Sequence, residues 1–277
     1  MRILVTSAAG ANGNGYGCVL SFGLDGEYQG RFTDDPRIVD PRGLKVDASG
    51  MLVYVNSGND RILALDRKGV VVRDSGHMAG LDPGGGIFAP DGRYHVGLRS
   101  ARTIAAFPAE LDAARQEILP RSVVPFPRGF AFGSADRLYL ASGVGPSGAG
   151  DNTILVFGAA GKLLTSHFVE DPELSPLDLT IAPNGNVVVS SEYPFACANA
   201  VGTVREYDAA DGHLVRVFES NRPATFRKPR GLRFGPAGDL YCVAQDEVLA
   251  FDFRNGQCLG PVIEWPRLNG QAIEFFG

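Results

Sequence analysis

Short apolar runs alternate with clusters of Gly, Asp and Asn along the whole chain. The runs are rich in Val, Leu, Ile, Phe and Tyr, and their large residues tend to recur at every second position, which is the period of a β-strand with one face buried. The clusters between them hold the residue types that reverse the chain direction in tight turns. The pattern therefore predicts an all-β protein made of short strands.

A two-strand pattern occurs five times, and the five copies align without a gap. Each copy has a short apolar strand, a turn and a second strand with alternating large residues, as in PRGLKVDASGMLVYVNS from Pro41; the other copies begin at Pro83, Pro127, Pro176 and Pro229. A third and a fourth strand follow, for example at residues 61–65 and 70–73. Four antiparallel strands repeated at this spacing are typical of the blades of a β-propeller.

One further blade is predicted to form from both ends of the chain. Residues 268–277 match the first strand and turn of the repeat, and residues 1–7 match its second strand in frame. The chain is thus predicted to be a single domain, residues 1–277, of six blades: residues 268–277 plus 1–35, then about 40–80, 82–122, 126–172, 175–222 and 228–266. A ring closed in this way leaves no open sheet edge, so we expect a monomer whose termini lie close together.

The run from Pro41 to Gly69 resembles the NHL repeat, and the run from Pro229 to Gly256 is a second good copy. Asp178 departs from the repeat, which favours Gly at this position. The resemblance implies a six-bladed β-propeller. It does not select a function, because similar propellers serve as hydrolases, lyases and binding platforms.

Three arginines are predicted to surround one mouth of the central channel. The loops that enter the innermost strands open on the same side of the ring, and they carry Arg42, Arg128 and Arg230, with Gln271 beside the last entry. Guanidinium groups from separate blades favour a carboxylate or phosphate ligand. The structural alternative is that each arginine lies over its neighbouring blade or pairs with an acid.

Two carboxylates of one blade are the candidates for chemistry. Asp178 lies beside an inner-strand entry and Glu192 at the end of the second strand, so they would serve as catalytic acid and base, or as ligands of a divalent cation, Ca²⁺ or Mg²⁺. Asn56, Gln245 and Gln271 would complete a polar ring, unless they only hydrogen-bond to trapped water. Long loops at residues 8–16, 144–151 and 193–201 flank the mouth, and Tyr193 begins an apolar tip suited to cover a ligand.

Composition limits the kinds of partner that the protein is expected to bind. The net charge is -5 and no block of Lys or Arg stands out, so nucleic acid is not an expected partner. No apolar run approaches the roughly 20 residues that cross a bilayer, which predicts a cytoplasmic protein without a membrane partner. The four cysteines show no CxxC spacing and are expected to be reduced. The four histidines, including His95, occupy different repeat contexts and are expected to be structural.

Three function classes remain open. The first is a propeller that binds a small-molecule anion or a protein partner. The second is a metal-dependent hydrolase or lactonase, because length and blade number also resemble the gluconolactonase-like propellers. That resemblance implies an acidic metal ligand where this chain has Gln271, and an Asn-Gly entry where it has Leu177 and Asp178. The third is a metal-free lyase or biosynthetic enzyme with Glu192 or Asp178 as base.

Overall fold

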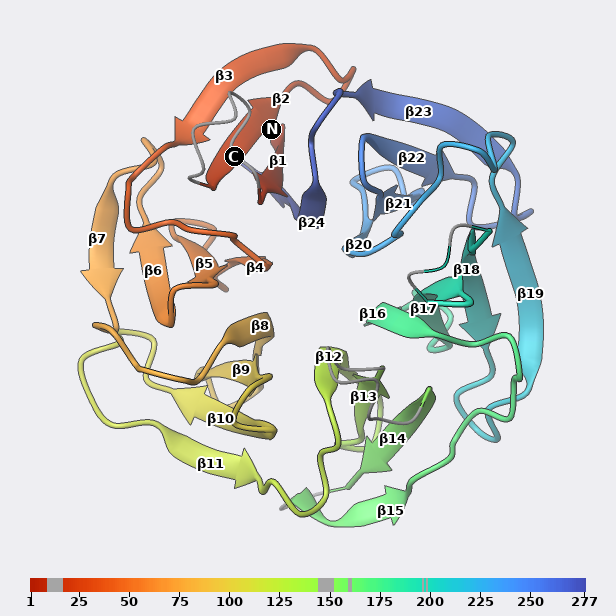
Figure 1. Cartoon of the computed structure of the whole chain (residues 1–277), viewed down its shortest axis with the longest axis horizontal. Helices are drawn as coiled ribbons and strands as arrows, with labels where there is room; N and C mark the ends of the chain where they lie inside the picture. The colour runs from red at the N-terminus through yellow and green to blue at the C-terminus, as the bar shows by residue number, and fades with distance from the viewer. Residues whose placement is uncertain (9–16, 144–151, 159–160, 196, 198) are drawn as a thin grey trace.

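The computed structural model contains six four-stranded antiparallel sheets arranged as a ring around a central channel (Figure 1). It describes residues 1–8, 17–143, 152–158, 161–195, 197 and 199–277. No helix occurs in this part of the chain, so none that is long and apolar enough to cross a membrane is found there. The predicted six-bladed β-propeller is confirmed.

Each blade runs from an innermost strand at the channel to an outermost strand at the rim. Blade one consists of β24 (Gly270–Phe276), β1 (Arg2–Ser7), β2 (Cys18–Phe22) and β3 (Tyr28–Thr33), and blade two of β4 (Gly43–Val46), β5 (Val53–Ser57), β6 (Arg61–Leu65) and β7 (Val71–Asp74). Blade three consists of β8 (Pro83–Phe88), β9 (Tyr94–Leu98), β10 (Thr103–Phe107) and β11 (Gln116–Leu119), and blade four of β12 (Pro127–Phe132), β13 (Leu138–Ser142), β14 (Thr153–Phe157) and β15 (Leu163–Thr165). Blade five consists of β16 (Pro176–Ile181), β17 (Val187–Tyr193), β18 (Val201–Tyr207) and β19 (Leu214–Glu219), and blade six of β20 (Leu232–Phe234), β21 (Leu240–Val243), β22 (Glu247–Phe251) and β23 (Cys258–Glu264).

The two ends of the chain complete blade one together. β1 pairs antiparallel with β24, with Arg2 opposite Phe276 and Ser7 opposite Gly270. A Cβ placed on Gly277 would lie 3.2 Å from the Met1 Cα atom, so the two termini are neighbours in space (Figure 1). Closure of the ring by the C-terminal strand, as the sequence predicts, is confirmed.

The hairpin turns follow from local chemistry. In blade two the Asp47 carboxylate accepts hydrogen bonds from the backbone N–H groups of Met51 and Leu52, at 2.9 and 3.0 Å. Gly50 in the same turn has a φ of 68°, which a residue with a Cβ adopts only at a cost. This Asp-to-Gly arrangement reverses the chain between the first and second strands.

The hydrophobic core lies between the blades. Each buried cluster combines side chains of two neighbouring sheets; Phe218 of blade five, for example, packs in the same cluster as Leu232 and Phe251 of blade six. All three side chains are fully buried. Truncating one such side chain to Ala typically costs about 2–5 kcal/mol, so contacts between blades hold the ring and fix its channel.

The innermost strands approach one another so closely that glycine is required at the channel wall. A Cβ on Gly129 would lie 1.8 Å from a carboxylate oxygen of Asp178, and one on Gly43 would lie 2.4 Å from the carbonyl oxygen of Gly84. The recurrent glycine of the repeat therefore permits neighbouring blades to meet at the channel.

Candidate functional site

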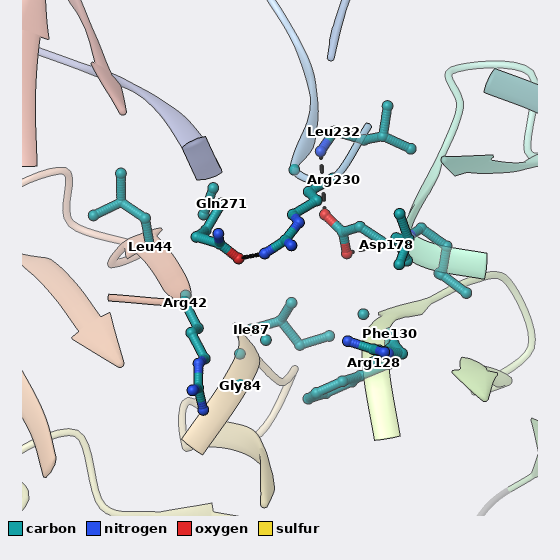
Figure 2. A pocket seen from close by; sticks show the side chains of 18 of the residues that line it. Arg42, Leu44, Gly84, Ile87, Arg128, Phe130, Asp178, Arg230, Leu232 and Gln271 are labelled. Carbon is teal, nitrogen blue, oxygen red and sulfur yellow. Dashed lines mark hydrogen bonds between the residues drawn. The ribbon is translucent and has the colours of Figure 1, made fainter. Parts of the chain in front are cut away.

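A cavity of about 80 Å³ occupies the channel, and the six innermost strands form its wall (Figure 2). The charged and amide side chains that line it are Arg42, Arg99, Arg128, Asp178, Arg230, Arg233 and Gln271. The structure thus brings together the three arginines, Asp178 and Gln271 that the sequence places at the mouth. Of the described residues that line the cavity, Asp178 alone is acidic.

Arg42 and Arg99 share a carboxylate at one side of the cavity. The Arg99 guanidinium donates three hydrogen bonds of 2.9–3.1 Å to the Asp82 carboxylate, and Arg42 also pairs with Asp82. The Arg42 Nε atom donates a further hydrogen bond of 2.9 Å to Asp40. Acids thus hold both arginines in place, which is the structural role that the sequence analysis gave as the alternative to ligand binding. Both arginines also line the cavity.

Arg128 is positioned by aromatic rings. Its guanidinium carbon lies 4.8 Å from the ring centre of Phe126 and 5.3 Å from that of Phe195, a favourable arrangement for a cation. Burial lowers the pKa of Arg128 to about 9, and repulsion from Arg99 and Arg230 adds to this shift. A guanidinium remains charged at neutral pH in spite of such a shift.

Arg230 points toward Gln271 across the cavity and donates a hydrogen bond to its side-chain oxygen (Figure 2). Gln271 in turn donates a hydrogen bond of 3.3 Å to the carbonyl oxygen of Asn269. Burial lowers the pKa of Arg230, which is partly offset by attraction to Asp40. Arg230 therefore carries a partly buried positive charge that is hydrogen-bonded to a neutral amide.

Asp178, on β16 of blade five, lies beside Arg230 with both carboxylate oxygens engaged (Figure 2). One oxygen accepts a hydrogen bond of 2.9 Å from the backbone N–H of Leu179, and the other accepts one of 3.1 Å from Leu232. Burial raises the pKa of Asp178 to about 6, although Arg233 and these hydrogen bonds oppose the shift. Desolvation is thus the dominant effect on this carboxyl group.

Further along the innermost strands, the charged side chains of Lys45, Arg233 and Glu274 pair with one another. The Glu274 carboxylate lies 3.1 Å from the Lys45 ammonium and 2.5 Å from the Arg233 Nε atom. Burial lowers the pKa of Lys45, with repulsion from Arg233 as the second cause. Lys45 and Arg233 therefore share one carboxylate, that of Glu274.

Glu192 does not line the cavity with Asp178. Its carboxylate is buried and accepts hydrogen bonds from the backbone N–H of Lys228, at 2.9 Å, and from Arg227, at 3.4 Å. These bonds tie the end of β17 to the segment that enters blade six. The structure therefore does not bring the two predicted catalytic carboxylates together around one cavity.

The remaining predicted residues lie elsewhere. The buried Asn56 joins blades two and three, because its amide donates a hydrogen bond of 2.6 Å to Gly84 and accepts one of 3.2 Å from Tyr94. Gln245 lines a separate groove with Trp265. Tyr193 is 39% exposed at the end of β17. Two of the predicted long loops lie outside the described residues: the first from residue 9 to residue 16, and the second over its whole length, 144–151.

The cavity does not fit a divalent cation. Such a cation takes several oxygen ligands, whereas Asp178 is the one acidic side chain among the described lining residues and both its oxygens accept backbone hydrogen bonds. The surrounding guanidinium groups would also repel a cation. We derive no reaction step through a metal.

Sequence reasoning missed Arg99, its partner Asp82, and Asp40, which pairs with Arg42. A signal was present, since both acids directly precede the proline that begins a repeat, as Asp-Pro at 40–41 and at 82–83. Arg99 directly follows the second strand of its blade, where the chain returns to the mouth. The ion pair between Arg42 and Asp82 joins blade two to blade three.

Comparisons with known proteins support the fold. No protein-family model matches the chain, and no curated protein matches it. A chain of the nidogen/laminin complex is similar in structure, with a TM-score of 0.74 and 14% identity over 98% of this chain and 97% of that one. The WD40 β-propeller domain of Doa1 has a TM-score of 0.66 and 14% identity over 99% of this chain and 83% of that one.

An enzyme of the same architecture is also similar. Streptogramin B lyase has a TM-score of 0.60 and 14% identity over 80% of this chain and 69% of that one. At such identities the likeness extends to the fold and not to the site, and these neighbours differ in what they do. The six blades of this chain thus form a β-propeller fold that is similar to that of distant proteins of varied function.

Proposed function

We propose that this protein binds a small anionic molecule at the mouth of its channel, with a carboxylate or phosphate group inserted among the arginines. The observation that carries the proposal is the convergence of Arg42, Arg99, Arg128 and Arg230 on one cavity whose described lining holds a single acid, Asp178. Arginine offers paired donors that match the oxygens of a carboxylate or phosphate.

The electrostatics favour an anion over an empty or water-filled cavity. Burial, together with repulsion from other arginines of the cavity, lowers the pKa values of Arg128 and Arg230, which means that their charged forms are destabilised by the surroundings. An anion between them would relieve this repulsion. Arg42 and Arg99 are oriented by Asp82, so little side-chain ordering would be required when a ligand binds.

The size of the cavity restricts what enters it. A volume of about 80 Å³ is well below the ~300–1,000 Å³ of a site that encloses a drug-sized molecule. The acidic group of the ligand therefore occupies the cavity, and the rest of the molecule lies at the mouth near Phe195, whose ring covers Arg128.

The experiment is isothermal titration calorimetry with two probes, inorganic phosphate and succinate. We expect Arg128→Gln or Arg230→Gln to weaken binding of the preferred probe roughly ten- to a hundredfold, the range expected for the loss of a hydrogen bond to a charged group. Arg115→Gln serves as the matched control, because this arginine is exposed near the rim. The proposal is wrong if neither probe binds the wild-type protein, or if the cavity variants bind as tightly as the control.

Binding without chemistry is the form of the proposal that the geometry supports. Asp178 and Glu192 are engaged with different groups, which weakens the acid-and-base and metal-dependent alternatives. A lyase remains the alternative if succinate or a related acid is converted during the titration. The repeat beginning at Pro41 still supports an NHL-type classification, and a protein partner that presents an acidic side chain would use the same cavity.

A further inference from the structure

Two buried tyrosines connect neighbouring blades on the side of the ring where the hairpins turn. Tyr54 of β5 donates its hydroxyl hydrogen bond to the carbonyl oxygen of Ala109 in blade three. Tyr139 of β13 donates one of 3.1 Å to the carbonyl oxygen of Ala209 in blade five. In both cases a phenol ring fills the space between blades and its hydroxyl group reaches the loop that follows the third strand of the next blade.

His95 holds the same place in blade three. It lies opposite Ile87 of the innermost strand, as Tyr54 lies opposite Lys45. The imidazole is shorter than a phenol and 5% exposed. Neither of its ring nitrogens has a hydrogen-bond partner among the described residues, and the nearest carboxylate oxygen, of Asp91, is 3.9 Å away. Buried polar atoms in this condition are rare in native proteins and call for a ligand or water.

A groove opens beside this imidazole, between blades three and four. Its volume is about 640 Å³, within the range of small-molecule sites. The large apolar side chains among its described lining residues are Ile118, Leu119, Phe132, Leu138 and Phe157. The Phe132 ring stands edge-on to His95, with 5.6 Å between ring centres. None of the residues that line this groove lines the cavity of the channel.

The polar groups at the edge of the groove leave little positive charge for an anion, because Arg93 is the one lysine or arginine among the described lining residues. Arg93 donates hydrogen bonds of 2.8 Å to Asp91 and 2.6 Å to Gln116, so its guanidinium is already paired. Burial lowers the pKa of His95, and the imidazole is therefore neutral at pH 7. A neutral imidazole has one N–H donor and one nitrogen acceptor, which suits a hydroxyl group because it can donate or accept a hydrogen bond.

We propose that this groove binds a small uncharged phenol, with its hydroxyl group hydrogen-bonded to His95 and its ring against Phe132 and Leu138. Two observations carry the inference: the unpartnered, buried imidazole in an apolar groove, and the phenol rings of Tyr54 and Tyr139 at the corresponding places of two other blades. Replacement of tyrosine by histidine at one interface leaves room for a phenol from solution.

The test uses 4-methylphenol, which has the structure of a tyrosine side chain, and toluene, which lacks the hydroxyl group. We expect 4-methylphenol to shift the imidazole resonances of His95 in NMR spectra of the ¹⁵N-labelled protein. The other three histidines, His77, His167 and His213, are exposed, and their unchanged resonances provide the internal control. Toluene is expected to bind about tenfold more weakly, as the loss of one hydrogen bond implies.

Two variants of His95 test separately whether binding depends on the hydrogen bond to the imidazole and on the open space of the groove. His95→Phe keeps an aromatic ring, and the affinity for 4-methylphenol should fall about tenfold, to that of toluene. His95→Tyr introduces the residue that blades two and four have at this place and should abolish binding of both probes. Arg128→Gln should leave 4-methylphenol binding unchanged, which distinguishes this site from the anion site. The inference is overturned if the His95 resonances do not respond, or if His95→Phe binds 4-methylphenol as tightly as the wild type. Should His95→Tyr fail to fold in a thermal melt, the comparison of wild type with His95→Phe decides.

Discussion

At the scale of single residues, burial shifts the pKa of the aspartate in the channel and the pKa values of the arginines in opposite directions. It raises the pKa of Asp178 to about 6 and lowers that of Arg128 to about 9, because a charged form of either sign loses hydration inside the protein. Asp178 therefore changes its charge close to neutral pH. The arginines stay positive, so the net charge of the cavity depends on the protonation of one carboxyl group.

The affinity for the anion should depend on pH through Asp178. Above about pH 6 its carboxylate is ionised and repels a bound anion, whereas below that pH the neutral carboxyl group does not. Binding of the anion is thus favoured by protonation of Asp178, and we expect the affinity of the wild type for succinate or phosphate, relative to that of Asp178→Asn, to increase severalfold as the pH falls through about 6. Calorimetry across this range in wild type and Asp178→Asn checks it. A pH dependence that persists unchanged in Asp178→Asn would contradict the role of this residue.

At the scale of elements, the segment after β17 completes the mouth. It places the Phe195 ring on one guanidinium, that of Arg128, which also lies over Phe126. Phe126 precedes β12 of blade four, and Phe195 follows β17 of blade five. The orientation of Arg128 is thus set jointly by two blades.

We expect Phe195→Ala to weaken anion binding by roughly two- to fivefold, which corresponds to one exposed cation–π contact. Arg128 keeps its charge in this variant, so the loss should be smaller than that of Arg128→Gln. Tyr193→Ala is the control, because Tyr193 is largely exposed and does not line the cavity. If Tyr193→Ala weakens binding more than Phe195→Ala, then the sequence-based choice of Tyr193 is the better one.

At the scale of the whole molecule, stability depends on the closure of the ring. β24 contributes the buried side chains of Ile273 and Phe276 to clusters shared with neighbouring blades. It also covers the edge of β1 with backbone hydrogen bonds. An open ring would expose both the apolar side chains and the strand edge.

Removing residues 270–277 should therefore prevent cooperative folding, since the loss of each buried side chain alone costs about 2–5 kcal/mol. A circular permutant offers the matched control: a short Gly-Ser linker joins Gly277 to Met1, and new termini open at the exposed Gly80, between β7 and β8. We expect its melting temperature in calorimetry to stay within a few degrees of the wild type. A truncated chain that melts like the wild type would show that closure contributes little.

The sequence by itself determined the strands, the six repeats and the joining of the two ends in one blade. These features depend on local patterns that recur: alternating apolar residues, turns rich in Gly, Asp and Asn, and a proline at the start of five of the six repeats. The same register placed Arg42, Arg128, Arg230, Asp178 and Gln271 at one cavity, because residues at equivalent positions of a ring face the same channel.

Only the tertiary structure decided where side chains meet those of another blade. Glu192 turns to Lys228, and Asn56 to Gly84, while Arg99 reaches Asp82 beside Arg42. His95 fits the strand pattern as well as a tyrosine would, and its missing partner becomes visible only once the next blade is in place. The physical reason is that each repeat specifies its own hairpin through local sequence. The hydrogen-bond partners of its side chains belong to a neighbouring repeat. The packing of the two blades, and not the sequence position, brings these partners within hydrogen-bonding distance.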